Sequence, residues 1–122
     1  MTRNWEIIRE ILLRLESTNT PNAYVNANSF DGLPEQEVAY NMRLLSEAGY
    51  IEAKITSSSS GDGKINVALA NRLTNVGHDL LDTMRNESVW NKVKEKFTSN
   101  GIDMTFDLVV SVGKKIIEAM LS

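Results

Sequence analysis

The spacing of apolar residues changes twice in the central part of the chain, from a helical period to an alternating one and back. Over Pro34–Ala48 apolar residues recur on one helical face, at Val38, Met42 and Leu45, with Ala48 at its edge and Gly49, which ends the helix, on the same face. The segments Tyr50–Thr56 and Lys64–Leu73 alternate apolar and polar residues, as strands with one solvated face do. Between them, Ser57–Gly63 has no side chain able to build a core. The pattern predicts a helix, a β-hairpin with a loose tip and, opening at Thr74, another helix.

The N-terminal part predicts one helix followed by a segment without helical period. Apolar residues at three- and four-residue spacing predict a helix over about Asn4–Glu16, with Asn4 as its N-cap. The segment Ser17–Asn22 has loop composition, and Ala23–Phe30 alternates as a short strand would. A common winged helix has a full second helix at this point. We therefore expect that helix to be reduced to a turn, or replaced by a strand that pairs with the hairpin.

Three helices are expected after the hairpin. The first spans about Asn75–Arg85, the second begins at Ser88 and the third runs over about Thr105–Leu121. The last has an apolar stripe in heptad-like spacing, formed by Phe106, Val110, Gly113, Ile117 and Met120. The stripe predicts a homodimer built partly on this helix, and Gly113 would let another helix approach closely. The alternative is that the stripe folds back on its own chain.

Together these elements predict an α+β fold of winged helix-turn-helix-like type. The hairpin is the wing, the second helix is reduced or replaced by a strand, and two extra helices follow. The prediction is a single domain over residues 1–122, with a C-terminal helical extension over about 88–122. The alternative is a plain hairpin on another α+β domain.

Composition narrows the class of protein. The chain has 122 residues and no cysteine, so disulfides and thiolate metal sites are excluded. It contains no apolar run long enough to span a membrane, and a cytoplasmic location is the default expectation. The net charge of −3 argues against tight DNA binding, which relies on lysine and arginine contacts to phosphate. Over Pro34–Gly49, Arg43 stands against three glutamates.

The candidate DNA contacts lie on the Pro34–Ala48 helix and on the hairpin. Glutamine, asparagine and arginine side chains can recognise purine edges in a major groove. Lysines on a wing can neutralise phosphates. The predicted DNA-binding residues are Gln36, Tyr40, Asn41, Arg43, Lys54 and Lys64.

No catalytic constellation is visible, so we expect no enzyme activity, no cofactor and no metal site. His78 is the one histidine and lacks the spacing of a zinc site. A structural hydrogen bond is the expected role for it. Gly61-Asp62-Gly63 joins two strands, whereas a phosphate-binding loop opens a helix. Lys92, Lys94 and Lys96 are typical of a solvated helix face.

Several blocks of residues resemble a known family. They are Glu37–Tyr40, Leu44–Glu52, Arg72–Asp82 with its Leu-Thr-x-x-Gly-His-Asp motif, and Val89–Glu95. Together they resemble an uncharacterised domain-of-unknown-function family of small bacterial and prophage proteins, related to the YjcQ-like winged-helix proteins. The resemblance covers nearly the whole chain. It implies the winged-helix fold and a DNA-binding role, and it brings no established activity or functional residues.

Two functions remain open from the sequence. The first is a DNA-binding, transcriptional-regulator-like protein of prophage type, with double-stranded DNA as its partner. The second is a protein–protein interaction module that kept the winged-helix scaffold and does not bind DNA. Local charge balance separates them, because a DNA reader should be basic on its helix and wing.

Overall fold

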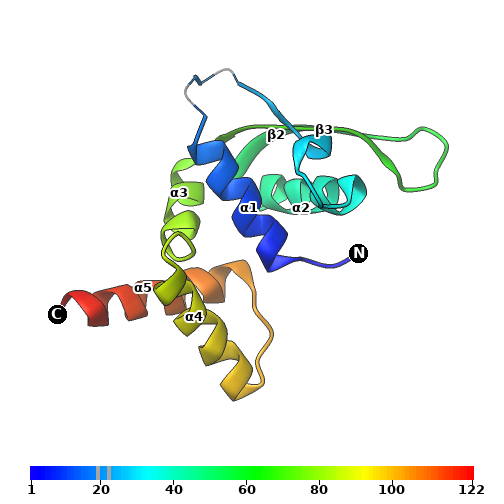
Figure 1. Cartoon of the computed structure of the whole chain (residues 1–122). Coiled ribbons are helices and arrows are strands. Elements are labelled where there is room, and N and C mark those ends of the chain that lie inside the picture. Colours follow the sequence, from blue (N-terminus) through cyan, green and yellow to red (C-terminus); the bar gives the residue numbers. More distant parts are fainter. Residues whose placement is uncertain (19, 22) are drawn as a thin grey trace. The chain divides into compact units, whose positions relative to one another are not determined.

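The computed structural model describes residues 1–18, 20–21 and 23–122 (Figure 1). Over these ranges the fold is α+β, with five α-helices and a three-stranded antiparallel sheet. The described chain divides into two compact units, Met1–Gly77 and His78–Ser122. None of the described helices is both long and apolar enough to cross a membrane. The loop predicted over Ser17–Asn22 includes Asn19 and Asn22, which lie outside the described residues.

The first helix, α1, spans Trp5–Glu16 and confirms the sequence-based prediction. The Asn4 side chain accepts hydrogen bonds from the backbone N–H groups of Glu6 and Ile7, both at 3.1 Å. These bonds satisfy two donors that have no partner inside the helix. Trp5, the first residue of the predicted apolar stripe, is only half-buried. The buried residues of α1 are Ile7, Ile8, Ile11, Leu12 and Leu15.

The segment after α1 combines both alternatives expected for the missing helix. Strand β1 is confined to Val25–Asn26, and the 3₁₀ turn η1 covers Ala27–Ser29. β1 pairs with the second hairpin strand, and Val25 lies opposite Ala70. The strand is shorter than the predicted Ala23–Phe30, because the Asn26 side chain accepts a bond from the Asn28 N–H at 3.0 Å and starts a turn.

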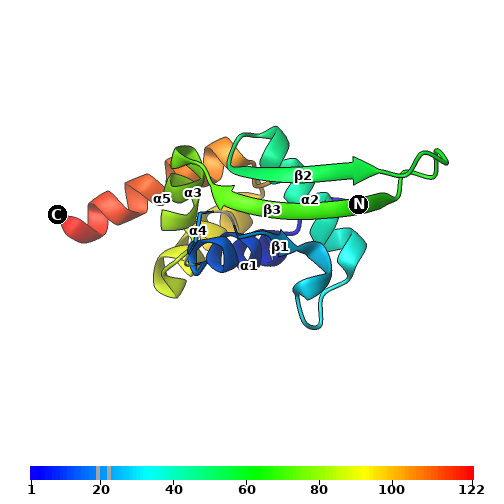
Figure 2. The same cartoon turned by 90° about the horizontal axis from the view of Figure 1, so that it is seen from above.

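Helix α2 spans Glu35–Glu47, and strands β2 and β3 span Ile51–Ser57 and Ile65–Leu73, close to the predicted bounds. The sheet order is β1-β3-β2, with every pairing antiparallel. Figures 1 and 2 show α1 and α2 on the same side of this sheet. The side chains of β2 alternate accordingly, so that Ile51 is buried and Lys54 is exposed.

The core of the first unit forms where α1 and α2 pack on each other and on the sheet. Ile8, Ile11, Leu12, Val38, Met42 and Leu45 have no exposed surface. The buried face of α2 differs slightly from the predicted one. Ala39 and Asn41 are buried, whereas Ala48 and Gly49 at the end of the predicted stripe are exposed.

Two sequence blocks of the family resemblance meet where β3 leads into helix α3, which spans Asn75–Asp82. The Thr74 N–H donates to the Tyr50 carbonyl at 3.0 Å, and the Thr74 hydroxyl donates to the Gly49 carbonyl. The same hydroxyl accepts a bond from the Gly77 N–H at 3.1 Å. Thr74 therefore caps α3 and fixes its start to the end of α2.

The second unit contains the end of α3 and helices α4, Glu87–Asn100, and α5, Phe106–Leu121, which pack together. α3 ends before the predicted Arg85, because the N–H groups of Thr83 and Met84 bond three residues back in a tighter turn. On α4 the buried residues are Val89, Trp90, Val93 and Phe97. On α5 Gly113 is buried against Thr83, so a turn of the same chain, rather than another helix, makes the close approach at this glycine.

Candidate functional site

Gln36, a predicted DNA contact, is engaged in the fold. Its amide nitrogen donates to the Ile65 carbonyl at 2.8 Å, and its amide oxygen accepts from the Ile65 N–H at 3.0 Å. The side chain thereby links α2 to the start of β3. To contact a base edge, the Gln36 amide would have to give up both hydrogen bonds. The N–H and the carbonyl of Ile65 would then lose these partners.

Asn41, the second predicted reading amide, is fully buried. Its oxygen accepts from the Asn4 N–H at 2.9 Å, and its nitrogen donates to the Glu37 carbonyl at 2.9 Å. The first bond joins α2 to the beginning of α1. A buried amide that is bonded at both ends has no exposed surface to offer a base pair, so Asn41 would have to leave these bonds to contact DNA.

The two remaining residues predicted on α2 are accessible, but they present little net positive charge. Tyr40 and Arg43 are both partly exposed. The Arg43 guanidinium lies 3.9 Å from the Glu47 carboxylate, one helical turn away. An exposed pair at this distance contributes little to stability, yet it reduces the positive charge that the helix presents.

Both lysines predicted on the hairpin are exposed: Lys54 lies on β2, and Lys64 lies next to the hairpin loop. The Lys54 ammonium lies 5.1 Å from the centre of the Tyr24 ring. Lys64 lies at the base of the hairpin loop, where its N–H donates to the Asp62 carboxylate at 2.9 Å. This bond lowers the pKa of Asp62, so a negative charge accompanies Lys64.

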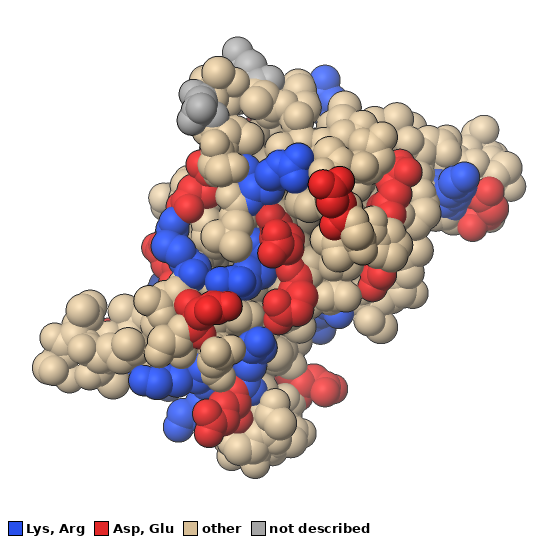
Figure 3. Space-filling model, viewed as in Figure 1, with Lys and Arg blue, Asp and Glu red and all other residues tan. Residues whose placement is uncertain are grey.

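Arg72 is similarly committed to an acidic neighbour. Its guanidinium donates to the Glu52 carboxylate at 2.7 Å across the β2–β3 pair, and this bond lowers the pKa of Glu52. Figure 3 shows acidic and basic side chains interspersed over the face of the first unit that it presents. Arg43 and Arg72 each lie beside a glutamate, and the Lys64 N–H is bonded to an aspartate, so negative charge accompanies three of the four predicted basic positions.

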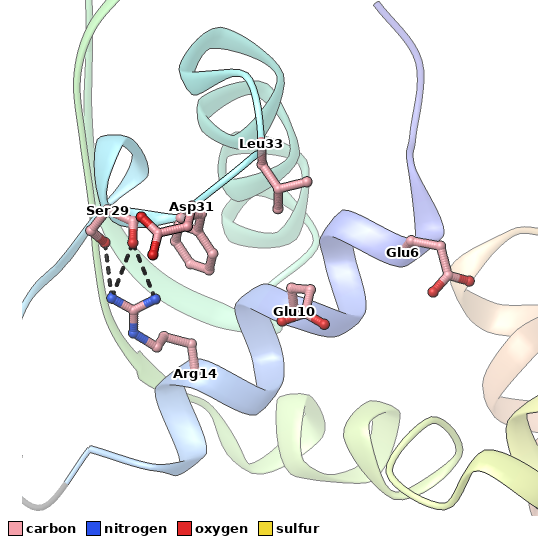
Figure 4. Close-up of a pocket in the computed structure, with 7 residues that line it drawn as sticks. Glu6, Glu10, Arg14, Ser29, Asp31 and Leu33 are labelled. Carbon is pink, nitrogen blue, oxygen red and sulfur yellow. Dashed lines mark hydrogen bonds between the residues drawn. The ribbon is translucent and has the colours of Figure 1, made fainter.

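A groove that the sequence did not indicate lies between α1 and the segment that leads into α2 (Figure 4). It is open to solvent, has a volume of about 640 Å³ and is lined by Glu6, Glu10, Arg14, Ser29, Phe30, Asp31 and Leu33. The Arg14 guanidinium donates to the Ser29 carbonyl and hydroxyl at 3.2–3.4 Å. It also lies 4.9 Å from the centre of the Phe30 ring. The available sequence signal was the four-residue spacing of Glu6, Glu10 and Arg14.

The other candidates from the sequence are not among the residues that line this groove. His78 is exposed on α3. Lys92 and Lys96 are exposed on α4, and the Lys94 ammonium lies 5.5 Å from the centre of the Trp90 ring one turn away. The described residues contain no group of three or more His, Cys, Asp or Glu side chains that could hold a metal ion.

Comparison with known proteins assigns the chain to a family. Residues 2–103 match the family described as "Hypothetical protein (DUF2513)", and the chain belongs to this family. An uncharacterized protein of Haemophilus influenzae is 39% identical over 122 residues, which cover the whole of both chains. No solved structure matches the chain. The sequence-based assignment to a family of unknown function is thus confirmed.

Proposed function

We propose that the chain is a non-catalytic protein-interaction module on a winged-helix-like scaffold. The observation that carries this proposal is the use of Gln36 and Asn41, the two amides that would read bases, as links within the fold. The acidic neighbours of Arg43, Lys64 and Arg72 support it, because DNA affinity depends on positive side chains that are available to phosphates.

DNA binding of the transcriptional-regulator, prophage type is the second candidate. It is favoured by the order of elements, with β1 and η1 replacing the second helix before α2 and the β2–β3 hairpin. It is also favoured by the exposure of Tyr40 and Arg43 on α2 and of Lys64 at the hairpin loop. This candidate includes the relationship to YjcQ-like proteins and rests on analogy at the level of the fold.

A titration with DNA separates the two candidates. We expect the fluorescence anisotropy of a labelled random duplex to stay flat up to tens of micromolar protein at low salt. The physical reason is that α2 and the hairpin offer few uncompensated positive charges. Salt-dependent binding, with a slope of log affinity against log salt of about −3 to −4, would contradict the proposal. Lys64→Gln should then weaken binding more than Lys92→Gln on α4, which removes the same charge elsewhere.

We also propose that the chain forms a homodimer through α5. Gly113 and Val109 are buried, but Met120 is 49% exposed and Leu121 is 82% exposed, so the apolar area at the end of the helix is uncovered. Light scattering should give twice the chain mass of 13.6 kDa. Met120→Asp should shift the mass toward the monomer, and Ser111→Asp, a new charge at another exposed position, should not. A monomer at high concentration of the unmodified chain would rule out the dimer.

A further inference from the structure

Strand β2 forms an outer edge of the three-stranded sheet, with β3 between it and β1 (Figure 2). In the described part of the chain β2 pairs with β3 alone, over residues 51–57. A strand at an edge presents a row of backbone N–H and C=O groups that a further strand can bind. The opposite edge differs, because β1 and the Gln36 side chain bond to β3 there. The edge of β2 is therefore a place where the sheet can be extended.

Two backbone hydrogen bonds establish which residues of β2 point toward this edge. At one end the Tyr50 carbonyl accepts from the Thr74 N–H at 3.0 Å. At the other end the Ser58 N–H donates to the Lys64 carbonyl at 2.7 Å. Residues 50 and 58 thus both bond on the β3 side, and the backbone groups of successive residues in a strand alternate between its two edges. The residues whose backbone groups point away from β3 are Ile51, Ala53 and Ile55.

We propose that β2 pairs with β2 of a second copy of the chain, antiparallel and centred on Ala53. The sequence is self-complementary in this register, because Glu52 and Lys54 flank Ala53 on its two sides. Glu52 of each copy then lies opposite Lys54 of the other. The proposal goes beyond the interaction-module function and the α5 contact, since it assigns the chain a second surface for association.

The two charges select this register over its neighbours. Since the backbone groups of Ala53 point outward, Ala53 forms a hydrogen-bonded pair with its copy, and Glu52 and Lys54 lie in the non-hydrogen-bonded pairs where side chains come closest. A shift by two residues would place Lys54 opposite Lys54, or Glu52 opposite Glu52, and like charges directly opposite are destabilising. A shift by one residue would place side chains of opposite faces beside each other.

The contacts that these charged side chains make within the chain are compatible with the pairing. Glu52 accepts from the Arg72 guanidinium at 2.7 Å through one carboxylate oxygen, and a carboxylate can accept several hydrogen bonds. The Lys54 ammonium lies 5.1 Å from the centre of the Tyr24 ring, and an exposed contact of this kind is weak. The backbone groups of the edge therefore supply the binding, and the charges determine its register.

The apolar face of the edge is also covered by the pairing. Ile51 is buried, whereas Ala53 and Ile55 on the same face of β2 are half-buried. In the proposed register Ile51 of one copy lies opposite Ile55 of the other, so the partly exposed isoleucine loses contact with water. The contact extends over residues 51–55 and is small, so we expect weak association that increases with protein concentration.

The test compares charge variants of the full chain, each of which also carries Met120→Asp to weaken the α5 contact. Sedimentation equilibrium measures the association constant. We expect Glu52→Lys and Lys54→Glu each to weaken self-association at least about fivefold, because each places like charges opposite each other. An equimolar mixture of the two variants should associate more tightly than either alone, because opposite charges then face each other again. Glu95→Lys, at an exposed position of α4, is the control and should leave the association constant unchanged.

Hydrogen exchange of the chain that carries Met120→Asp alone locates the contact. Exchange of the Ala53 N–H should slow as the protein concentration rises, whereas exchange of the Lys54 N–H, which points toward β3, should stay the same. A mixture that associates no better than its components, or concentration-independent exchange at Ala53, would overturn the proposal. Melting curves establish that each variant is folded. The result does not depend on the α5 contact or on the DNA titration, so failure of either leaves this test unaffected.

Discussion

Replacing Leu45 by alanine is expected to lower the free energy of unfolding by about 2–5 kcal/mol. Leu45 has no exposed surface and lies on the face of α2 that packs on α1 and the sheet. Its truncation removes buried methyl groups and leaves a cavity that the surrounding helices and strands fill only in part. Because small domains have a total stability of about 5–15 kcal/mol, the variant should lose a large share of it.

Urea denaturation followed by circular dichroism measures this loss. The control is Ile102→Ala, which truncates an aliphatic side chain of the same size at a position that is 55% exposed and lies outside α5. We expect the control to shift the free energy of unfolding by no more than about 0.5 kcal/mol. Equal midpoints for the Leu45 variant and the unmodified chain would show that the packed face of α2 is misassigned.

Replacing Gly77 by alanine is expected to destabilise the first unit by about 1–3 kcal/mol or more. A Cβ atom at position 77 would overlap the carbonyl oxygen of Tyr50, a backbone atom that also accepts the Thr74 N–H. The start of α3 would have to move away from Tyr50, which would strain or break the Thr74 bonds. The usual effect of this change has the opposite sign, since alanine inside a helix is more stable than glycine by about 0.5–1 kcal/mol.

The sign of the change in melting temperature therefore decides this prediction. Val76→Ala, at a neighbouring position of α3 that is 47% exposed, is the control and should leave the melting temperature nearly unchanged. A higher melting temperature for the Gly77 variant would contradict the close contact between α3 and Tyr50. It would indicate that Gly77 serves only as a weak helix former.

The periodicity of the sequence predicted the helices and the hairpin because burial of an apolar stripe is a local property of each segment. The stripe from Ile8 to Leu15 and the alternation of β2 each repeat within a few residues. Boundaries were less accurate. The end of α3 depends on the tighter turn at Thr83 and Met84, which apolar spacing does not show.

The functional assignment of the polar residues could not be predicted in this way. Asn41 bonds to a residue 37 positions away, and Gln36 bonds to one 29 positions away. Both amides are typical of a reading helix by residue type, and their partners become apparent when the chain is folded. The groove shares this property, since α1 and residues 29–33 line it together.

The pair of hydrogen bonds between Gln36 and Ile65 also bears on the aggregation of the protein. A donor and an acceptor on one side chain pair with the N–H and C=O of one residue, as a neighbouring strand would. Since β1 covers only positions 69 and 70 of β3 in the described chain, the hairpin end of β3 would otherwise present an open edge. Open edges invite strands from other molecules. Gln36 thus occupies hydrogen-bonding groups at the edge of β3, and its replacement by a side chain that cannot make these bonds should favour strand-mediated aggregation.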